Sequence, residues 1–530
     1  MTTYHDFLIG AARAHGQRPA LLIDDAELSY DELLARVERA AAGLTASGIG
    51  PSDHVAIVMD NSLECVLAWL ASSLIGCTEI PINPQYRGEL LHYLLDDSGT
   101  TAVICDRPYL PQVIDVMDRL PAIRSVFVNG HGAAPSGTTA RIVDFASCMT
   151  NCMEPGTFTS PDDAPEFVIL YTSGTTGPSK GVIHTQRSSL VLSRYNAEVM
   201  EYGPEDRLLN FFPLFHQNAR YTGVIPALVS GASIRVERKL STSRFWETCD
   251  KYGITAFNYL GSVLRMILNV TPPERHASGH TLRKAFGAGA PPIVWEEFEQ
   301  KLGIRLTETY GLSEAPMATL NASGARRAPV GSAGKGSDLF EVAVVDDEDR
   351  LLGPDEIGEI VMRPRQPDAM MIGYHNKDAA TVKAFRNLWF HSGDRGRLSA
   401  EGHLYFEERQ KDSIRRRGEN ISAWEVESVL EMHPDIAEAA VYGMAAEDSD
   451  EDVAAALVLN GPDADLESIM AFAHDKLPAY AVPTLVRIVR DLPRTPTEKV
   501  KKEELRSVAR SEHVDTSTVG TGQPSQPANG

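Results

Sequence analysis

Apolar residues recur along this chain at two spacings, one typical of helices and one of buried strands. Apolar side chains repeat every three or four positions over 30–44 and 63–74, which predicts two helices. Short uninterrupted apolar runs at 55–59 and 102–105 predict strands that are buried on both faces. This alternation predicts parallel sheets covered by helices, and therefore an α/β fold.

A smaller unit is predicted towards the end of the chain. The pattern there indicates a helix over 423–432, followed by strands at 439–442 and 454–459. We place the boundary at Lys411/Asp412, which leaves a small α+β domain after it.

These boundaries divide the chain into three parts. We predict a large N-terminal domain over 1–411 and a C-terminal domain over 412–510. The remaining segment, 511–530, is polar and rich in Gly, Pro and Ser, so we expect a disordered tail. Residues 133–139 are small and predict a loop.

Composition excludes several classes of protein. The 530 residues are 43% hydrophobic and 23% charged, as in a large soluble globular protein. A net charge of −22 opposes nucleic-acid binding, which needs clustered Lys and Arg. The apolar run 65–77 is too short to span a bilayer, and the start of the chain lacks the pattern of a signal peptide. Six cysteines without a Cys-x-x-Cys pair favour reduced thiols and a cytoplasmic location.

The stretch 171–182 carries the strongest chemical signal. It reads Tyr-Thr-Ser-Gly-Thr-Thr-Gly-Pro-Ser-Lys-Gly-Val and follows an apolar run, 167–170, that predicts a buried strand. Its glycines allow backbone N–H groups to face a ligand, and its hydroxyls and Lys180 add donors and a positive charge. Such a loop suits a polyphosphate, although a flexible surface loop is the alternative. It is not a Walker A loop, because Lys180 is followed by Gly181.

This loop resembles the phosphate loop of the adenylate-forming superfamily, which contains acyl- and aryl-CoA synthetases, peptide-synthetase adenylation domains and luciferases. Further segments resemble that superfamily's motifs in the expected order: Pro213–His216, Gly289–Pro291, Thr309–Glu314, His391–Asp394, Arg409–Asp412, Gly418–Ile421 and Pro493–Lys499. The resemblance covers residues 5–505 and is strongest to acid–CoA ligases, in particular the carnitine/crotonobetaine–CoA ligase branch.

The resemblance implies a two-step ligation. A carboxylic acid reacts with ATP to give an acyl-adenylate and diphosphate, and coenzyme A then displaces AMP. ATP, Mg²⁺ and coenzyme A are therefore the expected cofactors, and the acid, ATP and coenzyme A the expected partners. Two alternatives stay open: an enzyme that loads a separate carrier protein, and a non-catalytic protein that binds an acyl group or nucleotide. A homodimer is also left open.

The resemblance further assigns residues to the nucleotide. Tyr310 would stack on adenine, Asp394 would accept hydrogen bonds from the ribose, and Arg409 would hold the ribose or phosphate. For Tyr310 the alternative is an ordinary core aromatic, and for Ser-Gly-Asp a simple turn. Glu314 would bind Mg²⁺, with Thr172 as a second ligand. The full nucleotide set is Thr172, Ser173, Gly174, Thr175, Thr176, Gly177, Lys180, Gly289, Ala290, Pro291, Thr309, Tyr310, Gly311, Ser313, Asp394 and Arg409.

Catalysis and thioester formation are expected to involve the C-terminal domain. By resemblance, Lys499 bridges the attacking carboxylate and the α-phosphate, next to Glu498 where the superfamily usually has Gly. Asp412 would be the hinge of the mobile domain. Arg417, Gly418 and Glu419 would contact coenzyme A, although a solvated face is the alternative for the Arg triplet at 415–417.

The acid itself is the least determined part of the prediction. Segments that line the acyl pocket in the superfamily contain Arg220, Tyr221, Asn258, Tyr259 and Gly287, and His216 is expected as a gate or a carboxylate contact. Arg220 would pair with a second polar or anionic group on the acid, or else point to solvent. The sequence does not name the acid.

Overall fold

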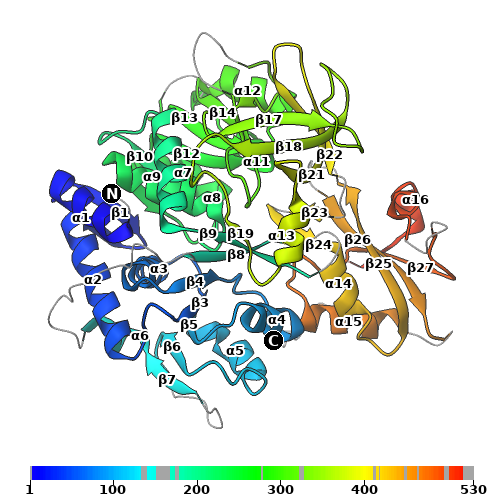
Figure 1. The fold of residues 1–530 in the computed structure, drawn as a ribbon, viewed down its shortest axis with the longest axis horizontal. Helices are drawn as coiled ribbons and strands as arrows, with labels where there is room; N and C mark the ends of the chain where they lie inside the picture. Colours follow the sequence, from blue (N-terminus) through cyan, green and yellow to red (C-terminus); the bar gives the residue numbers. More distant parts are fainter. Residues whose placement is uncertain are drawn as a thin grey trace, which may run out of the picture. The chain divides into compact units, whose positions relative to one another are not determined.

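The computed structural model describes residues 3–132, 140–150, 167–172, 178–275, 279–321, 328–409, 413–416, 418–446, 451–461, 465–494 and 500–516. They form a mixed α/β protein in two compact units (Figure 1). The first unit contains the described residues up to Gln410, except for the segments Gln85–His92 and Ser173–Ser179. Those segments belong to the second unit, together with the chain from Lys411 onwards. The predicted α/β class is confirmed, while the exact limits 1–411 and 412–510 stay a prediction.

The first unit contains a nine-stranded sheet in which six neighbouring strands are parallel. Its order is β16 (Lys335–Gly336), β15 (Thr319–Leu320), β14 (Arg305–Tyr310), β13 (Lys284–Ala288), β12 (Ala256–Leu260), β10 (Arg207–Asn210), β11 (Ser233–Val236), β1 (Pro19–Ile23) and β2 (Ala26–Ser29). The predicted parallel architecture is thereby confirmed.

A second large sheet of eight strands, also mainly parallel, lies in the same unit. Its order is β19 (Gly373–Tyr374), β9 (Lys180–His184), β8 (Val168–Thr172), β4 (Thr78–Pro81), β3 (His54–Val58), β5 (Ala102–Asp106), β6 (Ser125–Asn129) and β7 (Arg141–Asp144). The strands predicted at 55–59, 102–105 and 167–170 are confirmed as β3, β5 and β8.

Helices pack on these sheets (Figure 1), and the buried apolar residues of the unit form at least two hydrophobic clusters. The helix predicted over 30–44 is α2 (Tyr30–Ala46), which begins at a capping box between Ser29 and Glu32. The helix predicted over 63–74 is α3 (Leu63–Ile75), with Ser62 as N-cap and Gly76 in the left-handed conformation after its last turn. Both predictions are confirmed.

Further helices precede the first strand or lie between strands. They are α1 (Tyr4–His15), α4 (Gly88–Asp97), α5 (Leu110–Met117), α6 (Phe145–Thr150), α7 (Gln186–Val199), α8 (Gln217–Ala219), α9 (Ile225–Ser230), α10 (Phe245–Tyr252), α11 (Gly261–Asn269), α12 (Pro292–Leu302) and α13 (Asp378–Ala384). All belong to the first unit except the beginning of α4, which belongs to the second up to His92. None of the helices in the described ranges has both the length and the apolar character needed to cross a bilayer.

A third, mainly antiparallel sheet completes the first unit. Its strands are β17 (Phe340–Val345), β18 (Gly358–Pro364), β21 (Trp389–Leu398) and β20 (Phe385–Arg386), with β22 (Leu404–Arg409) paired to β21. The register places Asp394 of β21 opposite Arg409 of β22, so these two predicted site residues occupy adjacent strands.

The second unit has its own sheet and core (orange in Figure 1). A hairpin of β23 (Ser413–Arg416) and β24 (Glu419–Ser422) precedes α14 (Ala423–Leu430), and the sheet order is β25 (Ile436–Ala445), β26 (Glu451–Leu459), β27 (Leu485–Val489), β28 (Val514–Asp515). Helices α15 (Leu466–Lys476) and α16 (Lys502–Arg506) belong to the same unit. The predicted helix at 423–432 and the strands at 439–442 and 454–459 are confirmed.

The predicted disordered tail is wrong for residues 511–516. Strand β28 pairs with β27 in antiparallel register, Leu485 opposite Asp515 and Val486 opposite Val514. Thr516 also donates its N–H to the carbonyl of Thr484 at 2.9 Å. Backbone pairing thus orders a segment whose polar composition indicated disorder. Residues 517–530, and the predicted loop at 133–139, lie outside the described residues.

Candidate active site

The site is built where parallel strands of the nine-stranded sheet end. Strands β12, β13 and β14 are neighbours and run in the same direction, so their carboxyl ends meet at one edge. The segment Gly289–Pro291 follows β13, and Tyr310 ends β14. Loops at such an edge are where α/β proteins bind ligands.

Glu308 fixes the segment after β13. Its Oε1 accepts the N–H of Ala290 at 3.0 Å, and its Oε2 accepts the hydroxyl of Tyr259 at 2.6 Å. Tyr259 is completely buried, and Gly287 lies beside it in register. Gly289 takes a left-handed conformation with φ of 73°, which glycine adopts without strain. The Glu308 carboxylate of β14 thus binds both the Gly-Ala-Pro segment and Tyr259 of β12.

The turn after β14 requires a glycine. A Cβ on Gly311 would lie 2.6 Å from the N of Met317 and 2.9 Å from the O of Ala315, which is too close for any side chain. The turn closes through two hydrogen bonds between the backbones of Leu312 and Ala315, each 3.2 Å. Thr309, just before it, donates its hydroxyl to the carbonyl of Thr319 at 2.7 Å.

Tyr310 and Asp394 come from different sheets and meet directly. The Tyr310 hydroxyl donates to Oδ2 of Asp394 at 2.9 Å, and the two residues are 8% and 3% exposed. The alternative for Tyr310 was an ordinary core aromatic. Its hydroxyl instead has a specific hydrogen-bond partner in another sheet. The side chain of Arg409, opposite Asp394 in register, lies outside the described atoms.

Glu314, Tyr374 and Lys180 form a second group. The Tyr374 hydroxyl donates to Oε1 of Glu314 at 2.7 Å, and the Lys180 ammonium lies 4.9 Å from the centroid of the Tyr374 ring. Burial, followed by the negative charge of Glu314, raises the pKa of Tyr374, so the hydroxyl stays a donor. Lys180 pairs in register with Thr172 of β8, at the end of the phosphate loop. Residues 173–177 of that loop lie outside the described residues.

His184 ties strand β9 to the turn that carries Glu314. Its Nε2 lies 2.7 Å from the carbonyl O of Ser313, and its Nδ1 lies 2.9 Å from the hydroxyl of Ser188. Burial lowers the pKa of His184 to about 4, although its bond to Ser313 acts in the opposite direction. The imidazole is therefore neutral at pH 7. Sequence reasoning missed both His184 and Tyr374, because neither stands in a motif.

Arg220 differs most from its prediction. Its guanidinium makes two 2.6 Å hydrogen bonds to the carboxylate of Glu79 on β4, and it lies 4.4 Å from the Trp69 ring centroid. It also donates to the carbonyl of Leu214. Arg220 is 1% exposed, so the alternative that it points to solvent is wrong. Since its donors already have partners inside the protein, we replace the predicted contact with the acid by a structural role.

The other residues predicted near the acid fall into two kinds. Tyr221 and Tyr259 are enclosed in hydrophobic cores, and Asn258 is buried among polar side chains. His216 is partly exposed at the start of α8, where its ring lies 4.5 Å from that of Phe215. Their proximity to an acid stays a prediction.

The predicted residues of the second unit are only partly described. Gly418 has φ of 85° and, with Glu419, forms the turn side of the β23–β24 hairpin. Asp412, Arg417 and Lys499 lie outside the described residues, and their roles stay predictions.

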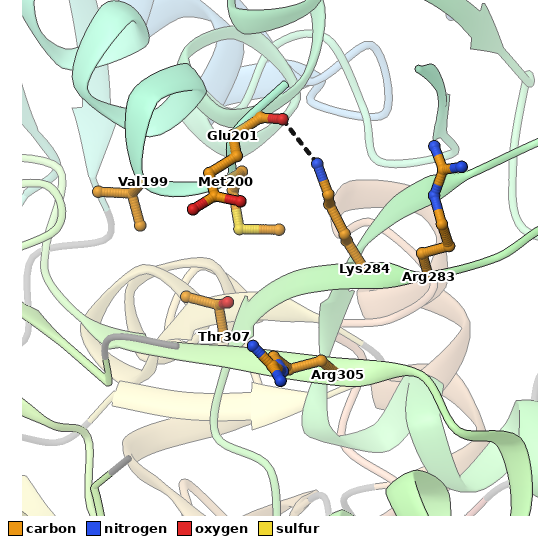
Figure 2. A pocket seen from close by; sticks show the side chains of 7 residues that line it. All are labelled: Val199, Met200, Glu201, Arg283, Lys284, Arg305 and Thr307. Carbon is orange, nitrogen blue, oxygen red and sulfur yellow. Dashed lines mark hydrogen bonds between the residues drawn. The ribbon is translucent and has the colours of Figure 1, made fainter. Parts of the chain in front are cut away.

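A surface pocket lies at the opposite ends of the same strands. Figure 2 shows its lining, which includes Lys284 and Arg305, the first residues of β13 and β14. Lys284 donates to the carbonyl of Glu201 at 2.7 Å and Arg283 to Asp206 at 2.8 Å. Lys284 and Arg283 thus already have protein partners, and the pocket is separated from the predicted site by the length of the strands.

Comparison with known proteins agrees with this geometry. The chain matches the model of AMP-binding enzymes over residues 9–375, and that of their C-terminal domain over residues 425–499. It therefore belongs to the AMP-binding enzyme family.

Relatives define its place in that family. Crotonobetaine/carnitine–CoA ligase from Salmonella typhimurium is 27% identical over 508 residues, covering 93% of this chain and 97% of the relative. A double mutant of o-succinylbenzoate CoA synthetase from Bacillus subtilis has a TM-score of 0.84 at 26% identity, covering 95% of this chain and 98% of its own. An amide bond synthetase from Marinactinospora thermotolerans has a TM-score of 0.80 at 25% identity, covering 95% and 99%. Together these comparisons support an AMP-forming acid–CoA ligase, which uses ATP and proceeds through an adenylate.

Proposed function

We propose that this protein activates a carboxylic acid at the edge formed by β12–β14, with the residues described above in specific roles. The observation that carries the proposal is the direct bond between Tyr310 and Asp394, which brings two motifs of the resemblance together. Asp394 receives the ribose hydroxyls, Tyr310 and Gly289–Pro291 enclose the adenine, and Lys180 faces the phosphates.

The first step needs no general base. A carboxylic acid is already ionised at neutral pH. Its oxygen forms a bond to the α-phosphorus of ATP, and the bond from that phosphorus to the bridging oxygen breaks, so that diphosphate leaves. The protein has to orient the reactants and stabilise the added negative charge. Lys180 and, by resemblance, Lys499 supply positive charge for this purpose.

Glu314 fits a role in holding Mg²⁺. One of its carboxylate oxygens accepts the Tyr374 hydroxyl, which orients the group and leaves acceptor capacity on the other oxygen. In the described ranges no three His, Cys, Asp or Glu side chains gather as a metal site. A single carboxylate such as that of Glu314 is compatible with Mg²⁺. In phosphate-transfer sites this ion is bound by one or two carboxylates, and phosphate oxygens and water complete its coordination. When bound, the ion neutralises phosphate charge, and Thr172 is the second proposed ligand.

In the second step the thiol of coenzyme A, having lost its proton, attacks the acyl carbonyl and AMP leaves. We propose that Asp412 is the hinge for this step and that Arg417, Gly418 and Glu419 contact coenzyme A.

We also propose a cytoplasmic location, supported by five buried free cysteines at positions 65, 77, 105, 148 and 249. We further propose that the protein is a homodimer, which a light-scattering measurement of its mass would test.

The test is acid-dependent release of diphosphate from a panel of carboxylic acids, with and without coenzyme A. Release that yields a CoA thioester supports the ligase. Release without thioester favours loading of a carrier protein, and no release with any acid contradicts catalysis. Lys499→Ala is expected to abolish adenylation but to spare thioester formation from supplied acyl-adenylate, whereas equal loss of both steps contradicts its role.

A further inference from the structure

A group of buried and half-buried polar side chains lies near the carboxyl end of β10 and against β12. We call it the amide cluster; its members are Asn210, Gln217, Asn218, Thr222 and Asn258. Asn210 and Asn258 are only 1% and 2% exposed. So many polar side chains in a protein interior require hydrogen-bond partners.

Asn258 and Thr222 donate hydrogen bonds within the cluster. Asn258 Nδ2 donates to Asn218 Oδ1 at 3.1 Å and to the Thr222 carbonyl and hydroxyl, both at 2.9 Å. The Thr222 hydroxyl donates to Asn218, with its carbonyl at 2.7 Å and its Oδ1 at 2.8 Å. The cluster is therefore rigid at Asn218, Thr222 and Asn258.

Two acceptors remain. The Oδ1 of Asn210 and the Oε1 of Gln217 are buried and have no hydrogen-bond partner in the described part of the chain. Their orientation is fixed by the other half of each amide, because Asn210 Nδ2 donates to the Phe212 carbonyl at 2.9 Å and Gln217 Nε2 to the Leu312 carbonyl at 3.1 Å. If either amide were flipped, its oxygen would face the carbonyl oxygen to which its nitrogen now donates, which is unfavourable. At Asn210 and Gln217 the cluster therefore offers acceptors.

The cluster adjoins the site described above. Gln217 binds Leu312, which belongs to the turn between Tyr310 and Glu314. Asn210 ends β10, whose neighbour β12 lies beside β13 in the same sheet. A Cβ on Gly223 would lie 3.6 Å from Asn258 Nδ2 and 3.7 Å from Asn210 Oδ1, so both atoms lie beside this glycine.

We propose that the amide cluster recognises a neutral hydrogen-bond donor, an O–H or N–H group, carried by the carboxylic acid. This names the substrate class and rests on the function proposed above. A buried acceptor without a partner is unfavourable, and a ligand donor relieves that state only in the complex. A plain alkyl or aryl acid cannot do so, because it has no donor away from its carboxylate.

The charges nearby favour a neutral donor. The hydrogen bonds of the cluster run to amides, one hydroxyl and backbone carbonyls among the described residues, not to a carboxylate. The buried ion pair of Arg220, two residues before Thr222, with Glu79 is closed on itself by two 2.6 Å bonds. A buried ammonium on the substrate would lack a counter-charge.

The experiment compares acids that differ only in the donor: 4-hydroxybenzoate and 4-aminobenzoate against benzoate, and 3-hydroxybutyrate against butyrate. The kcat/KM for acid-dependent diphosphate release is measured for the wild type and for Gln217→Met and Asn210→Leu. Gln112→Met is the matched control, because Gln112 also donates its amide to a carbonyl, that of Pro84 at 2.6 Å.

The wild type is expected to prefer the donor-bearing acid of at least one pair by about tenfold or more. Gln217→Met and Asn210→Leu reduce that ratio several-fold with the KM for ATP unchanged, and Gln112→Met does not. If the wild type favours neither acid, or both variants keep its ratio, the acceptors hold only water and the proposal is overturned.

Binding of the same pairs, measured by calorimetry on wild type and variants, keeps the two proposals separate. If no acid supports diphosphate release, the proposed function fails, while the binding ratio still decides whether the cluster selects a donor. A preference in binding that both variants abolish supports the cluster, and equal binding of the paired acids overturns it.

Discussion

The hydroxyl of Tyr310 donates a 2.9 Å hydrogen bond to Oδ2 of Asp394, a residue 84 positions further along the chain. The bond orients the carboxylate and occupies one of its oxygens, so the other oxygen is presented in a fixed direction. A carboxylate held in this way loses little freedom when it accepts hydrogen bonds from a ligand. Preorganisation of this kind is a general source of affinity.

We predict that Tyr310→Phe raises the KM for ATP by about tenfold to a hundredfold, because a hydrogen bond to a charged group contributes about 1.5–3 kcal/mol. The KM for the acid should stay near that of the wild type. Tyr405→Phe, on strand β22, is the control. An unchanged KM for ATP in Tyr310→Phe would show that Asp394 does not depend on this bond.

Glu314→Gln is expected to lower adenylation by about a hundredfold and to raise the Mg²⁺ concentration needed for half-maximal rate, because a neutral amide is a poor ligand for a hard cation. Tyr374→Phe removes only the supporting bond and is expected to have an effect of about tenfold or less. The measurement is diphosphate release across a Mg²⁺ titration. A Mg²⁺ requirement that Glu314→Gln leaves unchanged would contradict the assignment.

The Arg220–Glu79 pair gives a prediction about stability. Arg220→Leu alone leaves a buried carboxylate without its partner and is expected to destabilise the protein by about 3–5 kcal/mol. Glu79→Gln with Arg220→Leu should recover part of that loss. Denaturant unfolding of both single variants and the double variant measures the coupling. If the double variant is as destabilised as the two single effects added together, the pair is not coupled.

His184 should make stability depend on pH. Its pKa is about 4 in the folded protein and about 6.5 in an unfolded chain. Between these values the unfolded state binds more protons, so stability falls as the pH decreases from 6.5 to 4, by about 3 kcal/mol from this residue.

The measurement is the difference in free energy of unfolding between wild type and His184→Gln at several pH values. That difference should shrink as the pH falls, because the variant has no imidazole to protonate. His131→Gln, at an exposed position, is the control. A difference that stays constant from pH 7 to pH 4 would contradict the neutral, buried state of His184.

The sequence predicts the architecture well, because hydrophobic spacing is a local property. The ends of α3 follow from Ser62 and Gly76, and both can be recognised without tertiary contacts. Motif residues such as Tyr310 and Asp394 are also recognisable, but the bond between them is not, since it depends on how two sheets pack.

What sequence reasoning missed has a physical reason in each case. Tyr374 and His184 act by supporting Glu314 and Ser313, and such supporting residues carry no spacing signal. For Arg220 the sequence predicts a contact with the acid or with solvent, because its partner Glu79 lies 141 positions away in the chain. Glu79 is a charged residue in the short buried strand 78–81, and a charge in a buried strand implies a partner of opposite sign.

Strand β28 has a practical consequence for anyone who shortens this protein. Val514 and Asp515 cover the outer side of β27, and His513 Nε2 lies 2.8 Å from the Tyr442 hydroxyl. Removing the chain from residue 511 would leave the backbone groups of β27 unpaired along a free sheet edge, where strands from other molecules can add. Such a truncation is expected to self-associate, whereas a tag placed after residue 516 keeps the edge closed.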